Sequence, residues 1–343
     1  MLKQIKRAAL SLLKMSGGFS LIQHSSWRRG RLLILAYHGV ALADEHLWNP
    51  NLYMAPNYFR ARLQLIKAAG CTVLPLAEAL RRLYAGDLPE KSVALTFDDG
   101  CYDFYRQTYP ILSEFNFPTT LYLTTFYSHF NRPVFDVICP YLLWKGRGYE
   151  LNLDELIGAG GTLSLAADNA RDAAWHTLYE FARAHRLSAE EKDDLAARLA
   201  ARLHVDYGRL LHERILHIMT PQEVSQLAAE GVDVQLHTHR HRTPMERRLF
   251  MREIEDNRHS IQAMTGLSPT HFCYPSGVYD DAFFAWLKES GVESATTCNP
   301  DIARRMTNPL LLPRLVDTSY LSSVEFEGWL TGVAALLPQR ARG

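Results

Sequence analysis

Residues 92–100 have the sequence SVALTFDDG, an apolar run that ends in two adjacent carboxylates and a glycine. The run predicts a buried strand from Ser92 to Phe97. If the strand continued, Asp98 and Asp99 would point to opposite faces of the sheet. Gly100 permits a sharp turn, which can direct both carboxylates into one pocket at the end of the strand. Taken alone, the stretch is also compatible with a solvated Asp-Gly turn.

Strands and helices alternate on both sides of this stretch. The apolar runs predict strands over residues 32–37, 71–74, 92–97, 119–124, 232–236, 271–274, 292–297 and 310–316. Helical periodicity predicts helices between them, over 59–67, 76–84, 109–115, 246–264 and 281–290. This alternation is typical of parallel βα units, and seven or eight short strands favour a barrel over an open sheet.

The middle of the chain breaks the alternation. Residues 135–219 are rich in alanine and charge and have helical periodicity, with capping sequences that begin helices at Ser188 and, just beyond, at Thr220. We therefore expect a mostly helical insertion over 135–219 within a barrel domain of residues 31–330. An N-terminal segment (1–30) and a C-terminal tail (331–343) complete the predicted organisation.

A second polar cluster follows the strand predicted over 232–236, where the sequence reads HTHRH from His237 to His241. Histidines four residues apart lie on one side of a helical turn, as in other metal sites. His239 is the competing ligand, but its offset of two residues suits an extended chain better. A polar loop without a ligand is the other interpretation. The sequence from His212 to His217, HERILH, is one residue too long for the H-E-x-x-H zinc motif, and a solvated helix is expected there.

Together the two clusters contain the residues of a metal hydrolase. Two histidines and one carboxylate leave coordination positions open for water and a substrate oxygen. The second aspartate then provides a base beside a metal-bound water.

These two stretches, TFDDG and HTHRH, resemble the first two signature motifs of the polysaccharide deacetylases, the NodB-like carbohydrate esterases of family 4. The resemblance implies that Asp98 is the catalytic base and that Asp99, His237 and His241 bind a divalent metal ion, zinc above all. It also implies a distorted (β/α) barrel with the site at the C-terminal ends of the strands.

Weaker elements extend the resemblance. FCYPSG (272–277) is similar to the third motif, one wall of the substrate groove, which suggests Tyr274, Pro275 and Gly277 as substrate-binding residues. LPRL (312–315) is similar to a late element whose arginine, here Arg314, contacts the base. LAYHGV (35–40) looks like the opening strand of a subgroup that acts on exopolysaccharides and lipid-linked glycans. The usual late L-x-H histidine is missing, and we expect His38 to replace it as general acid, with a structural histidine as the alternative.

The expected activity is metal-dependent removal of an N-acetyl group from an amino sugar in a polysaccharide or a lipid-linked glycan. A deformylase or esterase acting on a sugar would use the same residues, and a non-catalytic glycan-binding module is a further alternative. A non-haem iron oxygenase also uses two histidines and a carboxylate, but usually on a β-sandwich. The sequence does not distinguish acetyl from formyl, or a polymer from a lipid-linked or nucleotide sugar.

Composition limits the partners and the compartment. Thirty-seven basic and thirty-seven acidic residues give no net charge, which argues against nucleic acid as a partner. Five scattered cysteines predict reduced thiols in the cytoplasm. The apolar residues of the first turns have helical spacing, with the cations on the other side, over too short a run to span a bilayer. This helix is expected either to rest on the inner membrane surface or to dock on the protein.

Overall fold

The computed structural model of the chain describes residues 2–337, so residues 338–343 of the predicted tail lie outside the described part. Its centre is a strongly curled sheet in which β1 (Arg31–Tyr37), β5 (Ser92–Phe97), β6 (Thr120–Leu123), β9 (Asp233–Leu236), β10 (His271–Cys273) and β11 (Ser294–Thr296) follow one another in parallel. A seventh parallel strand, β13 (Leu315–Val316), pairs with the other edge of β1. One parallel bridge from Thr296 to Leu312 links β11 to the chain just before β13. The predicted distorted barrel is confirmed.

The strand register brings the C-terminal ends of the central strands to one mouth. Tyr37 of β1 lies opposite Phe97 of β5, and Phe97 lies opposite Leu121 of β6. Leu123 of β6 in turn lies opposite Leu236 of β9. Residues that directly follow β1, β5 and β9 therefore emerge at the same end of the barrel.

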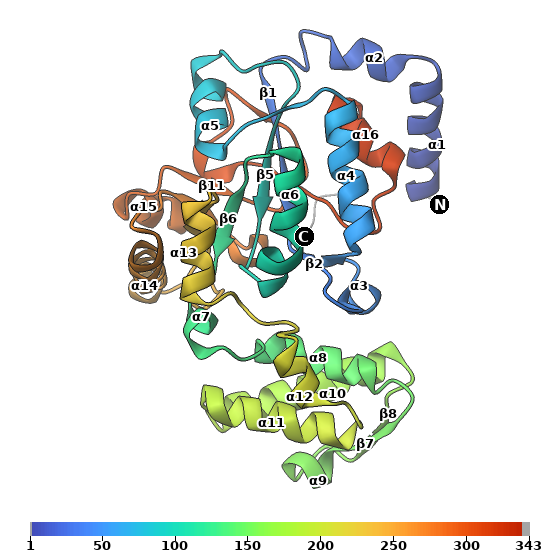
Figure 1. Cartoon of the computed structure of the whole chain (residues 1–343), viewed down its shortest axis with the longest axis vertical. Helices are drawn as coiled ribbons and strands as arrows, with labels where there is room; N and C mark the ends of the chain where they lie inside the picture. The colour runs from blue at the N-terminus through green and yellow to red at the C-terminus, as the bar shows by residue number, and fades with distance from the viewer. Residues whose placement is uncertain (1, 338–343) are drawn as a thin grey trace.

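Helices surround the sheet, as Figure 1 shows, and bury an apolar core against it. They are α4 (Pro56–Ala68), α5 (Leu76–Ala85), α6 (Tyr109–Phe115), α13 (Pro221–Ala229), α14 (Arg247–Thr265), α15 (Asp281–Glu289) and α16 (Ser323–Thr331). Helix α13 begins at the predicted capping box, in which Thr220 and Glu223 each accept a bond from the other's backbone N–H.

The barrel departs from the sequence prediction near its last strand. A strand was expected over 310–316, but Pro309–Leu311 is a 3-10 turn and only Leu315–Val316 pairs as a strand. Prolines 309 and 313 have no N–H to donate to a ladder, which shortens the strand. The sheet also contains two short strands outside the ring, β4 (Thr72–Val73) on β5 and the antiparallel β12 (Ala303–Arg304) on β1.

The insertion forms a lobe beyond the mouth of the barrel (Figure 1). Its elements are α8 (Phe135–Lys145), β7 (Glu150–Asn152), α9 (Leu153–Ile157), β8 (Thr162–Ser164), α10 (Asp168–Ala184), α11 (Ala189–Arg202) and α12 (Tyr207–His212). The capping box expected at Ser188 is present at the start of α11. Strands β7 and β8 form an antiparallel hairpin that the helical periodicity did not predict. The lobe has an apolar core distinct from that of the barrel, and Tyr53 of the barrel side is part of it.

Two N-terminal helices, α1 (Leu2–Met15) and α2 (Gly18–Gln23), pack against α16. Leu10 and Phe19 are the residues that they bury there. Among the described residues, no helix has the length and apolar character needed to cross a bilayer.

Candidate active site

The two aspartates leave β5 in a tight turn. The backbone N–H of Asp98 still donates to the carbonyl of Tyr37, which extends the ladder by one residue. Asp99 (φ +72°) and Gly100 (φ +81°) are then both in the left-handed region, and a Cβ on Gly100 would overlap the side chain of Leu123. The turn depends on Asp99 as well as on the glycine, so an aspartate is held in a conformation that costs free energy.

Asp99, His237 and His241 come together at the mouth. The Nε2 atoms of both histidines lie 3.2 Å from Oδ1 of Asp99. Nδ1 of His237 donates to the carbonyl of Cys273 at 2.9 Å, which leaves its Nε2 without a proton and directed at the cluster. The structure thus brings together the three residues predicted to bind metal.

The two histidines meet by a route that differs from the predicted helical turn. Residues 237–241 form an irregular loop in which Thr238 (φ +61°) and His241 (φ +52°) are left-handed. Two local reversals of the backbone, in place of a helical turn, therefore bring the two histidines together. His239 points away, with Nδ1 2.8 Å from Oγ1 of Thr125 and its ring edge-on to Phe126.

A buried asparagine fixes the start of this loop. Asn257 of α14 accepts the backbone N–H of His237 at 2.9 Å, and its amide donates to the carbonyl of Leu123 and to Thr125. It therefore joins the ends of β6 and β9 behind the cluster. The sequence analysis missed Asn257, although its spacing from Ile254 and Ile261 places it on the buried face of α14.

The cluster fits a divalent cation. The three candidate ligand atoms lie within 4.8 Å of one another. Oδ1 of Asp99 is buried and has no hydrogen-bond donor among the described residues, a costly state that a cation would relieve. Two imidazoles and a carboxylate are a donor set that zinc accepts. The His241 and His237 side chains hold the pKa of Asp99 well below its usual range, although burial alone would raise it.

A second group of potential ligands, Asp98, His237 and Cys273, overlaps the first. It is the poorer cation site, because Nη2 of Arg314 lies 3.0 Å from the sulfur of Cys273 and only 2.8 Å from Asp98. A positive guanidinium at this distance repels a metal ion.

Asp98 is paired with Arg314 inside the protein. Nη1 and Nη2 of Arg314 donate to the two carboxylate oxygens at 2.7 and 2.8 Å, and the arginine side chain is fully buried. Burial alone would raise the pKa of Asp98, but the guanidinium outweighs it and the pKa lies below its ordinary value. Arg314 is itself oriented by the carbonyl of Thr297 and the hydroxyl of Thr96.

His38 reaches the same pocket from the end of β1. Its Nε2 lies 3.9 Å from Oδ2 of Asp98, and its side chain is partly open to the cleft. The structure therefore places His38, Asp98 and Arg314 in one row beside the cluster of Asp99, His237 and His241.

The third motif is placed differently from the prediction. Tyr274 is fully buried and its hydroxyl donates to the carbonyl of Leu310, and Pro275 is buried beside it. Of the three residues expected to bind substrate, only Gly277 lines the cleft, together with Ser276 and Val278. The left-handed conformations of Ser276 and Gly277 reverse the chain and direct the next residues outward.

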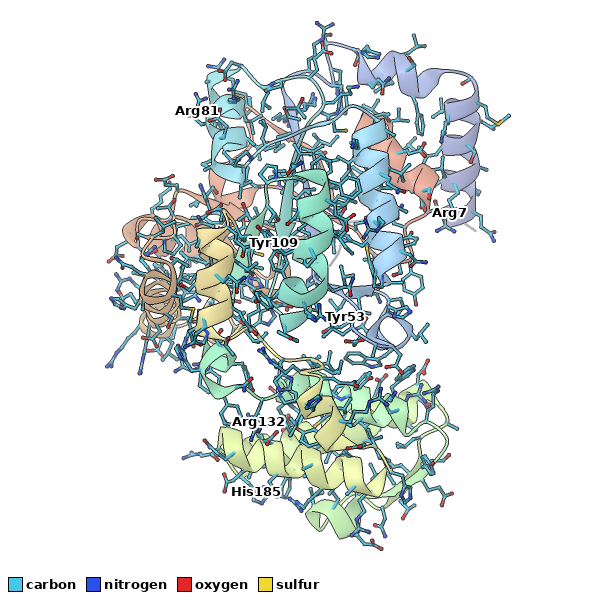
Figure 2. All side chains as sticks on the ribbon, viewed as in Figure 1. Arg7, Tyr53, Arg81, Tyr109, Arg132 and His185 are labelled. Atoms are coloured by element: carbon cyan, nitrogen blue, oxygen red, sulfur yellow. The ribbon has the colours of Figure 1, made fainter. Side chains whose placement is uncertain are left out.

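His38, Asp98, Asp99, His237 and His241 open into a cleft of about 1040 Å³. The barrel forms one side of it, including Tyr53, which Figure 2 labels where the barrel faces the lobe. Asp136, Val137 and Lys192 of the lobe line it as well. The insertion, whose purpose the sequence does not reveal, thus forms a wall of the site.

His217 is also placed differently from its prediction. It is buried in a turn that returns from the lobe, and its Nδ1 donates to the carbonyl of Ile215 at 3.0 Å. His212 is exposed at the end of α12. The expectation of a solvated helix therefore fails for His217, which follows the helix.

The fold and the cluster together define an α/β barrel with aspartate and histidine side chains gathered at the C-terminal mouth of its strands. The family model described as "Polysaccharide deacetylase" matches residues 85–136 and 185–295, which contain both aspartates and both histidines. These two segments belong to the polysaccharide deacetylase family.

Curated relatives match part of the chain. Poly-beta-1,6-N-acetyl-D-glucosamine N-deacetylase of Escherichia coli K12 is 30% identical over 101 residues, which are 29% of this chain and 15% of that protein. The Staphylococcus epidermidis RP62A protein of the same name is 29% identical over 75 residues, 22% of this chain and 26% of that protein. The matches thus span a minor part of these relatives.

Solved structures share the fold over most of the chain. Streptococcus pyogenes deacetylase PplD, in complex with acetate, has a TM-score of 0.58 at 20% identity and covers 90% of this chain and 99% of its own. IcaB from Ammonifex degensii has a TM-score of 0.54 at 16% identity, with 89% and 97% covered. At these identities the likeness concerns the fold.

Proposed function

We propose that the chain hydrolyses the N-acetyl group of an amino sugar within a polysaccharide or lipid-linked glycan. The observation that carries the proposal is the row of Asp98, Arg314 and His38 beside the cluster of Asp99, His237 and His241. Amide hydrolysis needs a base for water, an acid for the departing nitrogen and a charge that stabilises the oxyanion. The curated relatives named for poly-beta-1,6-N-acetyl-D-glucosamine support an exopolysaccharide as substrate.

Asp98 is the proposed base. Its two bonds from Arg314 keep it ionised and fix its orientation, so that it can accept a proton from the attacking water. A divalent cation held by Asp99, His237 and His241 would polarise the acetyl carbonyl and acidify a water molecule. We assign no catalytic step to His239, which is bonded to Thr125.

His38 is the proposed acid. As the carbon–nitrogen bond breaks, its Nε2 would give a proton to the amine, while the hydroxyl of the water remains on the acyl carbon as acetate. Its Nε2 is 3.9 Å from Oδ2 of Asp98, so both groups can face one substrate amide from the same side of the pocket. Gly277 and its neighbours would contact the sugar ring on one side. The lobe would contact the ring on the other side.

We also propose a reducing compartment, the cytoplasm. All five cysteines are free, and Cys273 and Cys298 both lie within 4 Å of the same guanidinium nitrogen without forming a disulfide. Thiol titration of the protein isolated from each cell fraction tests this. Quantitative oxidation of Cys273 or Cys298 in the native protein would contradict it.

Acetate release from defined glycans tests the activity. The substrates are β-1,6- and β-1,4-linked N-acetylglucosamine oligomers, a lipid-linked N-acetylamino sugar and their N-formyl counterparts, each with metal-loaded protein and with chelator. We expect acetate from at least one glycan, loss with chelator, and recovery on adding zinc. Formate alone would assign a deformylase, and binding without any product would assign a glycan-binding module; either result would reject the proposal.

A further inference from the structure

Helix α1 turns an apolar face away from the protein. Ile5, Ala8, Leu12 and Met15, which we call the outer face, are separated by three or four residues and therefore lie on one side of the helix. All four are exposed, Leu12 by 66% and Met15 by 84%. Leu21 of the adjoining α2 is exposed as well.

The opposite side of α1 attaches it to the barrel domain. Nε of Arg7 donates to Glu325 of α16 at 2.8 Å, and Lys14 forms an ion pair with Glu327 of the same helix. Leu10 is fully buried between these pairs. An ordinary surface helix buries its whole apolar stripe, whereas α1 buries Leu10 and leaves the outer face exposed.

We propose that the outer face docks on an anionic lipid surface. The face consists of a few side chains on two short helices, far fewer than the roughly 20 to 30 residues per partner of a stable protein interface. Helix α1 has 14 residues, too few to cross a bilayer. A short helix with an exposed apolar side can instead lie in the headgroup region with that side among the acyl chains.

Charge favours anionic lipids over neutral ones. The first acidic residue of the chain is Asp44, and seven lysines and arginines precede it. Glu325 and Glu327 of α16 offset the charges of Arg7 and Lys14, Glu90 offsets that of Arg29, and Arg28 is buried. By formal charge the region before Asp44 still remains positive. Anionic headgroups attract such a region over a distance set by the ionic strength.

The placement of α1 is compatible with catalysis at a surface. Figure 1 shows α1 beside α16 on the flank of the barrel, away from the lobe, and Figure 2 labels Arg7 there. A bilayer against the outer face would leave the cleft between barrel and lobe open to a glycan.

Co-sedimentation of the full chain with vesicles tests the proposal. One set of vesicles is pure phosphatidylcholine and the other contains phosphatidylglycerol as well. We expect binding to the anionic set, weakened by salt, and a loss of at least about tenfold in partitioning in the double variant Leu12→Gln/Met15→Gln. Both side chains are exposed, so the melting temperature of this variant should equal that of the wild type.

The chain offers a matched control in Leu267→Gln/Met306→Gln, because these residues are exposed by 66% and 86% on other parts of the surface. This control should bind like the wild type. Equal loss in both variants, or no binding by the wild-type chain, would overturn the proposal. Light scattering that shows a dimer dependent on Leu12 and Met15 would instead assign the outer face to a second copy and would equally overturn it. None of these outcomes depends on deacetylase activity.

Discussion

Arg314 donates two hydrogen bonds, of 2.7 and 2.8 Å, to the carboxylate of Asp98, and both side chains are buried. Paired and hydrogen-bonded charges of this kind are stable together, but either one alone is costly to bury. The pair therefore links the proposed catalytic base to the stability of the barrel.

Because of this pairing, Asp98→Asn should lower both the turnover and the stability of the protein. The amide cannot accept a proton, so turnover should fall at least ~10²-fold while the metal stays bound. Arg314 would keep a buried charge without a partner, so the free energy of unfolding should fall by about 3 kcal/mol. Urea unfolding, metal analysis and acetate assays measure the three quantities.

The double variant Asp98→Asn/Arg314→Met separates the two effects, because it should recover stability without recovering turnover. Asp99→Asn should instead weaken the metal, since an amide oxygen is a poorer ligand than a carboxylate. If Asp98→Asn loses metal while Asp99→Asn keeps it, the roles of the two aspartates are reversed.

His237→Ala and His241→Ala should each abolish tight binding of one divalent ion per chain. Each removes one of the three proposed ligands from the cluster. His239→Ala is the matched control, because this histidine is bonded to Thr125 and should leave the metal content unchanged. Metal analysis after dialysis provides the test, and full occupancy in His241→Ala would refute the ligand assignment.

His38→Gln should lower kcat by about 10²-fold with the metal retained, because glutamine cannot protonate the departing amine. The limb of the pH–rate profile that reports this acid should disappear. His239→Gln, also in the cleft wall, serves as comparison. An unchanged profile in His38→Gln would assign His38 to structure alone.

His217 should make the fold sensitive to acid. Burial lowers the pKa of His217 to about 4, against about 6.5 in the unfolded chain. The unfolded state therefore takes up a proton first as the pH falls, so the free energy of unfolding decreases between pH 6.5 and 4, by up to about 3 kcal/mol. His217→Gln should show a shallower decrease over this window in urea titrations; an identical slope would contradict the assignment.

The barrel and the meeting of Asp99, His237 and His241 were predictable because both depend on local patterns. Apolar runs such as 92–97 predict buried strands, and parallel strands place the residues that follow them at one mouth, which brings Asp99 near His237. The pairing of Asp98 with Arg314 spans more than two hundred residues, and the sequence suggested it only through a family resemblance.

Other features depend on packing that no local pattern encodes. Asn257 shares the buried face of α14 with Ile254 and Ile261, but its bond to the backbone of His237 depends on how α14 packs. Tyr274 was expected to bind substrate. Its aromatic ring instead packs in the core, and its hydroxyl donates to the carbonyl of Leu310. The outward orientation of α1 likewise depends on Glu325 and Glu327, which lie three hundred residues away.

The attachment of the lobe to the barrel has a consequence for how a chain of this kind can vary. The lobe leaves and rejoins the barrel through neighbouring segments, Pro133 being bridged to His217, and its apolar core takes in Tyr53 of the barrel side. Substitutions elsewhere in the lobe can reshape the far wall of the cleft while Asp98, Asp99 and His237 keep their places at the strand ends. The shape of the cleft could therefore change through this one appendage, provided that the packing around Tyr53 is kept.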